Sequence, residues 1–237
     1  MVGGAVNNTE SAPLIGVGSL RVAAKNAKLR AVTELLSIHP VDPQPRYVKR
    51  AVEVLRAGGI IIYPTDSCYA FGFHLGDTAP IREIQRIRQT SKDHNFTLVC
   101  RDLAEIATYA KVPNWCYRTL KAHTPGPYTF ILEATRSVPR RLQNPKRRTI
   151  GIRVPDHPVS QALLEEFGEP IMSSTVKLPG DQLPLTDPDE MTQRLKGDVD
   201  VILDAGACGI EPTTVVDLTG DFPRLVRHGK GDSSDFQ

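Results

Sequence analysis

Apolar residues recur along this chain with two different spacings, and the spacing changes several times. One group has the three- and four-residue spacing of a helix: Val48, Ala51, Val52 and Leu55. This spacing predicts a helix that ends near Gly58, because glycine readily takes the left-handed conformation that closes a helix. Residues 59–63, with four large apolar side chains in succession, predict a strand buried on both faces. The strand should end at Pro64, which cannot donate a ladder hydrogen bond.

The same patterns predict the remaining elements. Further helices are expected after Asp77 or Thr78, after Asp102, near 115–122, over 158–167 and after Asp187. Further strands are expected over 96–100, 128–133, 149–154, 170–174, 199–203, 214–218 and 224–227. Helices and strands alternate through the middle of the chain, and strands dominate its end. This order predicts an α/β fold, a mixed twisted sheet with helices on its faces.

The two ends of the chain differ in composition from the part between them. Residues 1–38 are rich in small residues and weakly basic, with Glu10 and Glu34 as their acids. We expect a poorly ordered N-terminal extension there, with a weak transit peptide or a mobile arm as alternatives. Residues 39–232 contain no clear linker and are expected to form a single domain, followed by a tail over 233–237.

The total charge is small, but it is distributed unevenly. The 237 residues are long enough for a real core and carry a net charge of +2. Seven Lys/Arg and no Asp/Glu lie between Arg136 and Arg153, and seven acidic residues lie between Asp181 and Asp204. A local basic surface suggests a polyanionic ligand, although a solvated charged loop gives the same pattern.

The cysteines give no sign of a metal site or of disulfides. Four are present, widely spaced, with no C-x-x-C pair and no Cys/His cluster, so no metal-ligating residues are predicted. Sparse cysteines fit a reducing compartment. No apolar run is long enough to cross a membrane, and the N-terminus lacks the pattern of a secretory signal. We therefore expect a cytoplasmic protein that does not contact the membrane.

Hydroxyl groups gather where two predicted strands end. Thr65, Asp66 and Ser67 follow the first strand, and Ser173, Ser174 and Thr175 follow the strand at Ile171. Open α/β sheets place ligands at such strand ends, and hydroxyls hydrogen-bond phosphates. Ordinary turns have the same composition, so neither cluster is specific by itself.

Arginines form a second set of candidate residues. Arg86 and Arg88 flank Ile87 near a helix end and lead into the polar segment 89–98. Guanidinium groups bind phosphate or carboxylate through two parallel hydrogen bonds, so this is a candidate anion site. A solvated helix end is the alternative. Arg153 and Arg227 each end a predicted strand and are candidate ligand anchors.

Three familiar motifs are absent from the sequence. It contains no G-x-x-x-x-G-K-[ST] loop, no G-x-G-x-x-G after a strand and no G-x-S-x-G elbow. A nucleotide would therefore have to be bound without those phosphate-binding loops.

Six segments follow one another along the chain: Tyr63–Tyr69, Arg86–Arg88 with Asn95–Leu98, Thr124–Gly126, Gly151–Pro158, Thr213–Asp217 and Arg227–Gly229. In this order they resemble the YrdC/YciO family. The YciO branch is the most similar, through 86–89 (Arg-Ile-Arg-Gln), 94–98 (His-Asn-Phe-Thr-Leu) and 178–180 (Leu-Pro-Gly). The resemblance covers most of the chain and implies a YrdC-like fold.

The resemblance also implies an activity. Family members make threonylcarbamoyl-AMP from L-threonine, bicarbonate and ATP, with Mg²⁺ on the phosphates, and release pyrophosphate. The product then modifies an adenosine in tRNA. By this resemblance Thr65, Arg153 and Thr214 contact threonine, and Arg86 and Arg88 are catalytic. The residues implied near the nucleotide are Arg86, Arg88, Asn95, Ser174, Thr175, Lys177 and Arg227.

Two departures from the family pattern leave other functions open. Arg86 stands where the synthases carry lysine, and Lys177 stands where they carry asparagine. One alternative is a paralogue that binds tRNA or double-stranded RNA with weak or lost synthase activity, as the basic run suggests. Another is a related enzyme that hydrolyses acyl-adenylates.

Overall fold

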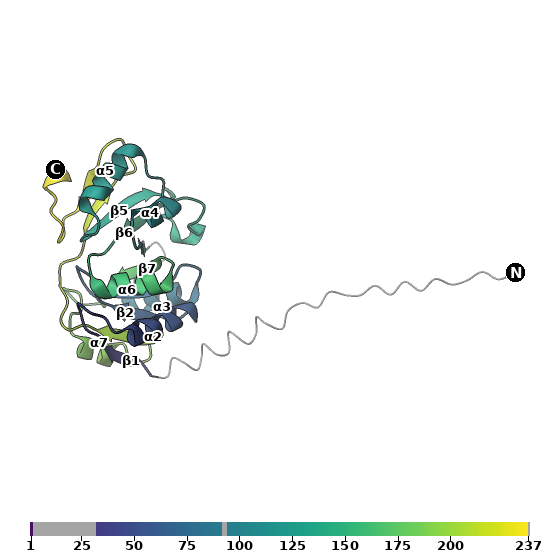
Figure 1. Ribbon diagram of the computed structural model, residues 1–237, viewed down its shortest axis with the longest axis vertical. Coiled ribbons are helices and arrows are strands. Elements are labelled where there is room, and N and C mark those ends of the chain that lie inside the picture. Colours follow the sequence, from purple (N-terminus) through teal and green to yellow (C-terminus); the bar gives the residue numbers. More distant parts are fainter. Residues whose placement is uncertain (2–31, 92–93, 237) are drawn as a thin grey trace.

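The computed structural model describes residue 1 and residues 32–91 and 94–236 (Figure 1). The helices are α2 (Pro45–Arg56), α3 (Ala79–Arg88), α4 (Leu103–Tyr109), α5 (Asn114–His123), α6 (Pro158–Phe167) and α7 (Pro188–Arg194), with 3₁₀ turns η1 (Arg140–Leu142) and η2 (Ser234–Phe236). The strands are β1 (Glu34–Ser37), β2 (Ile61–Tyr63), β3 (Ala70–His74), β4 (Thr97–Val99), β5 (Tyr128–Glu133), β6 (Thr149–Arg153), β7 (Ile171–Thr175), β8 (Val201–Asp204), β9 (Thr214–Asp217) and β10 (Arg224–Arg227).

Within the described residues, these strands form one ten-stranded sheet in the order β1-β8-β2-β3-β7-β4-β6-β5-β9-β10. Parallel pairs join β8 to β1 and β2, β4 to β6, and β5 to β9. The other neighbours are antiparallel. The predicted mixed sheet is therefore confirmed.

Strand β2 shows why the sheet is covered on both faces. Ile61 and Tyr63 pack with α2 and α6 on one face, whereas Ile60 and Ile62 belong to the core on the other. All four are fully buried, as the continuous apolar run predicts. Alternation along a strand thus divides one run between two cores.

The two cores use different helices. On one face, α2 and α6 contact each other and cover β2, β8 and β7 (Figure 1). The core on the other face takes buried side chains from α3, α4, α5 and α7 together with those of β3, β4 and β5. Neither core includes Thr129, Ile131 and Gly151, which alternate along β5 and β6 with the core residues Phe130, Leu132 and Ile152.

Capping signals read from the sequence are present in the structure. The Asp102 carboxylate accepts a hydrogen bond from the Glu105 amide and begins α4. The Asp187 carboxylate accepts from the Asp189 and Glu190 amides and begins α7. Thr78, in contrast, makes no side-chain cap bond at the start of α3.

The fold begins earlier and ends later than the expected boundaries. Glu34–Ser37 fell inside the predicted extension 1–38 but forms β1, which pairs with β8. The four residues of β1 alternate between half-buried and exposed. An alternation over only four residues cannot be distinguished from a loop in the sequence. In the predicted tail 233–237, the Phe236 side chain is buried against His123 and Tyr128. Residues 2–31 of the expected extension lie outside the described residues.

Strand β3 was not expected. Ala70–His74 follows β2 so closely that the sequence pattern indicates only a turn, but it pairs antiparallel with both β2 and β7. Gly72 allows this approach, because a Cβ there would lie 2.9 Å from the Tyr63 ring.

No helix in the described ranges has the length and apolar character that crossing a membrane requires. The same ranges contain no group of three or more His, Cys, Asp or Glu placed to hold a metal ion. The four cysteines are free thiols.

Candidate functional site

A cavity of about 470 Å³ opens beside the middle of the sheet. Its wall is formed by residues of the strands β3 to β7, β9 and β10, of the turn after β2, of the end of α3 and of the segments before β4 and β6. Four of them are arginines, Arg88, Arg147, Arg153 and Arg227, and no described lining residue is Asp or Glu. A concave site with converging cations and no carboxylate favours an anionic ligand.

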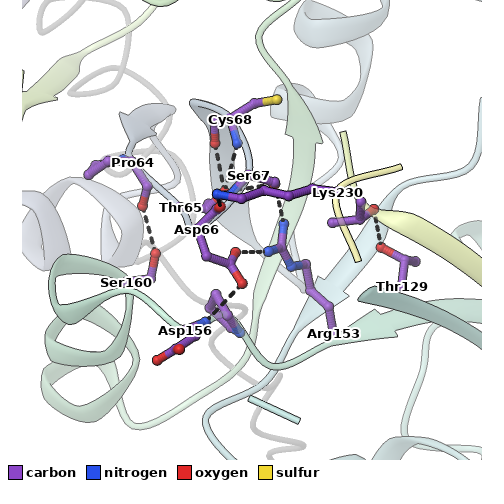
Figure 2. A network of polar contacts seen from close by, with 12 residues as sticks. Pro64, Thr65, Asp66, Ser67, Cys68, Thr129, Arg153, Asp156, Ser160 and Lys230 are labelled. Atoms are coloured by element: carbon purple, nitrogen blue, oxygen red, sulfur yellow. Dashed lines mark hydrogen bonds and ion pairs between the residues drawn. The ribbon is translucent and has the colours of Figure 1, made fainter. Parts of the chain in front are cut away.

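The turn after β2 places one hydroxyl in this cavity. The buried Thr65 Oγ1 accepts from the Ser67 and Cys68 amides at 3.2 Å each and donates to the Cys68 carbonyl at 2.7 Å (Figure 2). These bonds fold the chain back on itself after Pro64, and Ser67 then lines the cavity. Thr65 is therefore a positioning residue for Ser67.

Arg153, at the end of β6, is held by the same turn. Its guanidinium pairs with the Asp66 carboxylate, and its Nη1 donates to Ser67 Oγ at 3.2 Å (Figure 2). Asp66 Oδ2 also accepts from the Asp156 amide at 3.1 Å, and Lys230 donates to the Asp66 carbonyl. We call Arg153, Asp66 and Ser67 the Arg153 cluster.

The Arg153 cluster is buried and balanced in charge. The side chains of Arg153 and Asp66 are each 8% exposed. Asp66 is not among the residues that line the cavity, so its carboxylate holds Arg153 from behind. The Arg153 Nε is buried without a hydrogen-bond partner among the described residues, which leaves one donor unused.

A second cluster forms between the end of α3 and β7. Arg88 Nη1 contacts His94 Nε2 at 2.9 Å and donates to Ser174 Oγ, and Arg88 Nε donates to the Lys177 carbonyl at 3.3 Å. His94 Nε2 lies 3.0 Å from Ser174 Oγ. We call Arg88, His94 and Ser174 the Arg88 cluster.

Every partner in the Arg88 cluster is neutral near pH 7. Burial, and next the adjacent Arg88 charge, lower the pKa of His94 to about 4, so its imidazole is uncharged and accepts from Arg88. Burial also lowers the pKa of Arg88, and no carboxylate among the described residues is hydrogen-bonded to it. The guanidinium charge is thus half-buried and unbalanced, which favours a bound anion.

Thr213 and Arg227 complete the cavity wall from the C-terminal strands. Arg227 Nη2 donates to the Thr213 carbonyl at 2.7 Å, and Thr213 Oγ1 lies 2.8 Å from Thr129 Oγ1. Gly229 permits this arrangement, because a Cβ there would lie 2.5 Å from the Thr213 carbonyl carbon. This steric requirement explains why a glycine follows Arg227 two residues later.

Six of the ten residues predicted for the site line the cavity: Arg88, Asn95, Arg153, Ser174, Thr175 and Arg227. The structure does not bring Arg86 there. Arg86 instead pairs with Glu83 and Asp198. Residues two apart on a helix point about 200° from each other, so Arg88 facing the cavity turns Arg86 away.

The other three lie next to the cavity without lining it. Thr65 is buried behind Ser67, and Thr214 is fully buried with its hydroxyl donating to the Gly231 carbonyl at 2.6 Å. Thr213 lines the cavity in place of Thr214, because neighbouring strand residues point to opposite faces. The Lys177 amine donates to the Gln182 carbonyl at 2.8 Å, away from the lining.

Ser67, one of the hydroxyls expected at the end of the first strand, lines the cavity. Several other lining residues were not among the predicted site residues, namely His94, Thr129, Asn144, Arg147 and Thr213. Thr213 carries a signal that was available, the twofold alternation next to Thr214. Asn144 and Arg147 lie in the loop before β6, and no local pattern predicts that this loop reaches the cavity.

Known proteins resemble this chain in sequence as well as in fold. Residues 53–229 match the model of the Sua5/YciO/YrdC family, which carries the description "Telomere recombination". YciO of Escherichia coli K12, described as uncharacterised, is 50% identical over 205 residues, which cover 86% of this chain and 100% of YciO. The threonylcarbamoyl-AMP synthase of Bacillus subtilis 168 is 28% identical over 200 residues, covering 84% of this chain and 56% of the synthase.

Two solved structures have the same fold. The crystal structure of E. coli YciO matches with a TM-score of 0.83 at 50% identity, covering 86% of this chain and 100% of that one. P. abyssi Sua5 complexed with L-threonine matches with a TM-score of 0.76 at 24% identity, covering 83% of this chain and 58% of that one. The length of the family match and the identity to YciO show that this chain belongs to the Sua5/YciO/YrdC family.

Proposed function

We propose that this protein is an L-threonylcarbamoyladenylate synthase, which makes threonylcarbamoyl-AMP and pyrophosphate from L-threonine, bicarbonate and ATP. The observation that carries the proposal is the pair of arginine clusters in one cavity, one balanced in charge and one not. The similarity to the B. subtilis threonylcarbamoyl-AMP synthase supports the reaction. The P. abyssi Sua5 fold, solved with L-threonine, supports the amino-acid substrate.

In this proposal the Arg88 cluster binds the nucleotide phosphates. Arg88 brings a half-buried guanidinium whose partners are all neutral, so phosphate oxygens would supply the missing negative charge. Arg227 brings a second guanidinium, whose hydrogen bonds within the described part of the chain go to Thr213. Asn95 and Thr175, which line the same cavity, supply hydrogen bonds to the nucleotide.

The Arg153 cluster binds threonine. An amino acid is a zwitterion with no net charge, and its carboxylate needs a donor more than a full uncompensated cation. Arg153 lines the cavity and is held in place by Asp66, while Ser67 adds a hydroxyl. Thr65 and Thr214 act from behind the wall, as positioning residues.

The reaction has two steps that the cavity would favour by placing the reactants. The threonine amine combines with bicarbonate to give a carbamate and water. A carbamate oxygen then attacks the α-phosphate of ATP, and the bond to the β-phosphate breaks to release pyrophosphate. Burial raises the pKa of the lining thiol Cys68 to about 11, so it is not ionised near pH 7 and does not act as a nucleophile. Positioning and charge neutralisation are the contributions of the protein.

Magnesium would supply further neutralisation of the triphosphate. Oxygen ligands such as carboxylates hold this ion in proteins, and no described lining residue of the cavity is Asp or Glu. The ion therefore enters with ATP as part of the substrate, and we assign no residue to it.

The direct test is turnover by the pure protein with labelled ATP, L-threonine, bicarbonate and magnesium. We expect an adenylate and pyrophosphate that depend on threonine and on bicarbonate, and that Arg88→Ala abolishes. The matched control is Arg118→Ala, which removes an exposed arginine outside the cavity lining. Pyrophosphate release that is unchanged without threonine would remove the proposed substrate.

RNA binding is a second candidate function, and one observation favours it. Six cations of the basic run are exposed around η1 and the following loop: Arg136, Arg140, Arg141, Lys146, Arg147 and Arg148. Such a surface would release counterions on binding RNA, so affinity for tRNA should fall steeply with salt. Arg147→Ala with Arg148→Ala should reduce that slope, and affinity that ignores both salt and these changes would contradict it.

A further inference from the structure

A second cavity, also about 470 Å³, adjoins the first. Four residues line both cavities: His94, Asn95, Phe96 and Leu142. The rest of its wall comes from α3 and from the segment around η1, with Ile81 and Pro145 adding apolar surface. The described lining contains three arginines, Arg82, Arg140 and Arg141, and no Asp or Glu.

The arginines of the second cavity differ from those of the first in what they already bind. In the first cavity, Arg88, Arg147, Arg153 and Arg227 all have polar partners within the protein. Arg141 donates to the Gly76 carbonyl, which holds it at the wall of the second cavity. Arg82 and Arg140 form no side-chain hydrogen bond or ion pair with any described residue, so their guanidinium donors are available.

We propose that the second cavity binds a polyphosphate anion, either free pyrophosphate or the terminal phosphates of a nucleoside triphosphate held in the first cavity. The choice of this anion rests on the proposed function, in which ATP is split to pyrophosphate beside the shared wall. The positive charge itself is a property of Arg82, Arg140 and Arg141 and does not depend on that reaction.

The geometry separates this site from ordinary solvated arginines. Arg82 comes from α3, whereas Arg140 and Arg141 come from η1, more than fifty residues later, and all three line one hollow. Like charges that converge without a carboxylate repel one another, and a multiply charged anion relieves that repulsion. Each guanidinium can bind phosphate oxygens through two parallel hydrogen bonds. A cavity of this size has room for two phosphate groups.

The test is a calorimetric titration of the full chain with pyrophosphate, ATP and AMP, each without threonine. The variant is Arg82→Ala with Arg140→Ala, and the matched control is Arg118→Ala with Arg136→Ala. The control removes the same charge from two exposed arginines that line neither cavity. Unfolding temperatures of both variants establish that they are folded.

We expect the Arg82/Arg140 variant to lose at least tenfold in pyrophosphate affinity, while the control variant and AMP binding change less than twofold. A parallel loss for ATP would identify the source as the nucleotide tail, and a loss for pyrophosphate alone would identify the free product. Equal pyrophosphate affinity in wild type and variant would overturn the proposal, and so would an equal loss for AMP. Because no turnover is measured, failure of the synthase reaction leaves this result intact.

Discussion

The Arg153 cluster and the Arg88 cluster both join an arginine to a serine hydroxyl, yet they differ in the charge of the remaining partner. Arg153 is paired with the buried Asp66 carboxylate, whereas Arg88 contacts the neutral imidazole of His94. The difference indicates a division of roles within one cavity. A balanced cluster suits a ligand without net charge, and an unbalanced one suits phosphates.

The largest expected effect comes from removing the balance in the Arg153 cluster. Asp66→Asn keeps the shape but leaves the Arg153 charge buried without a counterion, which should lower the free energy of unfolding by about 3–5 kcal/mol. Urea unfolding measures this, with Asp156→Asn, an exposed neighbour, as the control. An equal small effect from both substitutions would mean that Asp66 does not balance Arg153.

The next largest effect tests which arginine of α3 faces the cavity. Arg88→Ala should weaken ATP binding by about 10- to 100-fold, because charged hydrogen bonds contribute roughly 1.5–3 kcal/mol each. Arg86→Ala removes the same charge from the same helix, but its side chain is paired with Glu83 and Asp198. We expect it to change ATP affinity by less than about threefold. Calorimetry compares the two, and a larger loss in Arg86→Ala would contradict the orientation.

A smaller effect tests the neutrality of His94. Its pKa is near 4 in the folded protein and about 6.5 in an unfolded chain, so only the unfolded state binds this proton between those values. Stability should therefore fall as pH drops from about 6.5 to 4. His94→Asn should remove about 1–2 kcal/mol of that fall, a figure reduced for the partial exposure of the ring.

The measurement for His94 is denaturant unfolding at several pH values. His228→Asn, an exposed histidine outside the lining of the cavity, is the matched control. If His94→Asn and wild type lose the same stability on acidification, His94 is not held neutral in the folded protein, and the imidazole adds a second positive charge beside Arg88 as the pH falls.

The smallest expected effect concerns Lys177. Its amine is bonded to the Gln182 carbonyl, outside the cavity lining. Lys177→Asn restores the residue that the resemblance implies for synthases and should change ATP affinity by less than about twofold, or 0.4 kcal/mol. Thr175→Ala, two residues earlier and in the lining, serves as the comparison. A larger change for Lys177→Asn would show that its side chain reaches the nucleotide.

Long periodic segments made most of the fold predictable. The apolar run at β2, the helical spacing in α2 and the Asp102 and Asp187 caps each correspond to an element of the structure. Strand β1 was missed because it has only four residues and pairs with β8, which is distant in the sequence. Strand β3 was missed because it follows β2 after a short turn, and its pairing with the distant β7 has no counterpart in the local pattern. Pairing with a distant strand leaves no local signal.

The candidate site was predictable by segment but not by residue. The sequence located the turn at Thr65, the end of α3 and the start of β9. It selected Thr65 and Thr214 where Ser67 and Thr213 line the cavity, and it selected both Arg86 and Arg88, of which Arg88 alone lines it. Which side chain faces a cavity depends on the rotation of the helix or strand in the fold. For Arg86 and Arg88 that rotation is set by Ile87, which packs into the core between them.

The most direct test of the two-cluster account is a crystal structure of the protein with L-threonine and a non-hydrolysable ATP analogue. The account predicts the analogue's phosphates in contact with Arg88 and Arg227, and the threonine carboxylate in contact with Arg153. Phosphates bound to Arg153, threonine bound beside Arg88, or both ligands outside the cavity would contradict it.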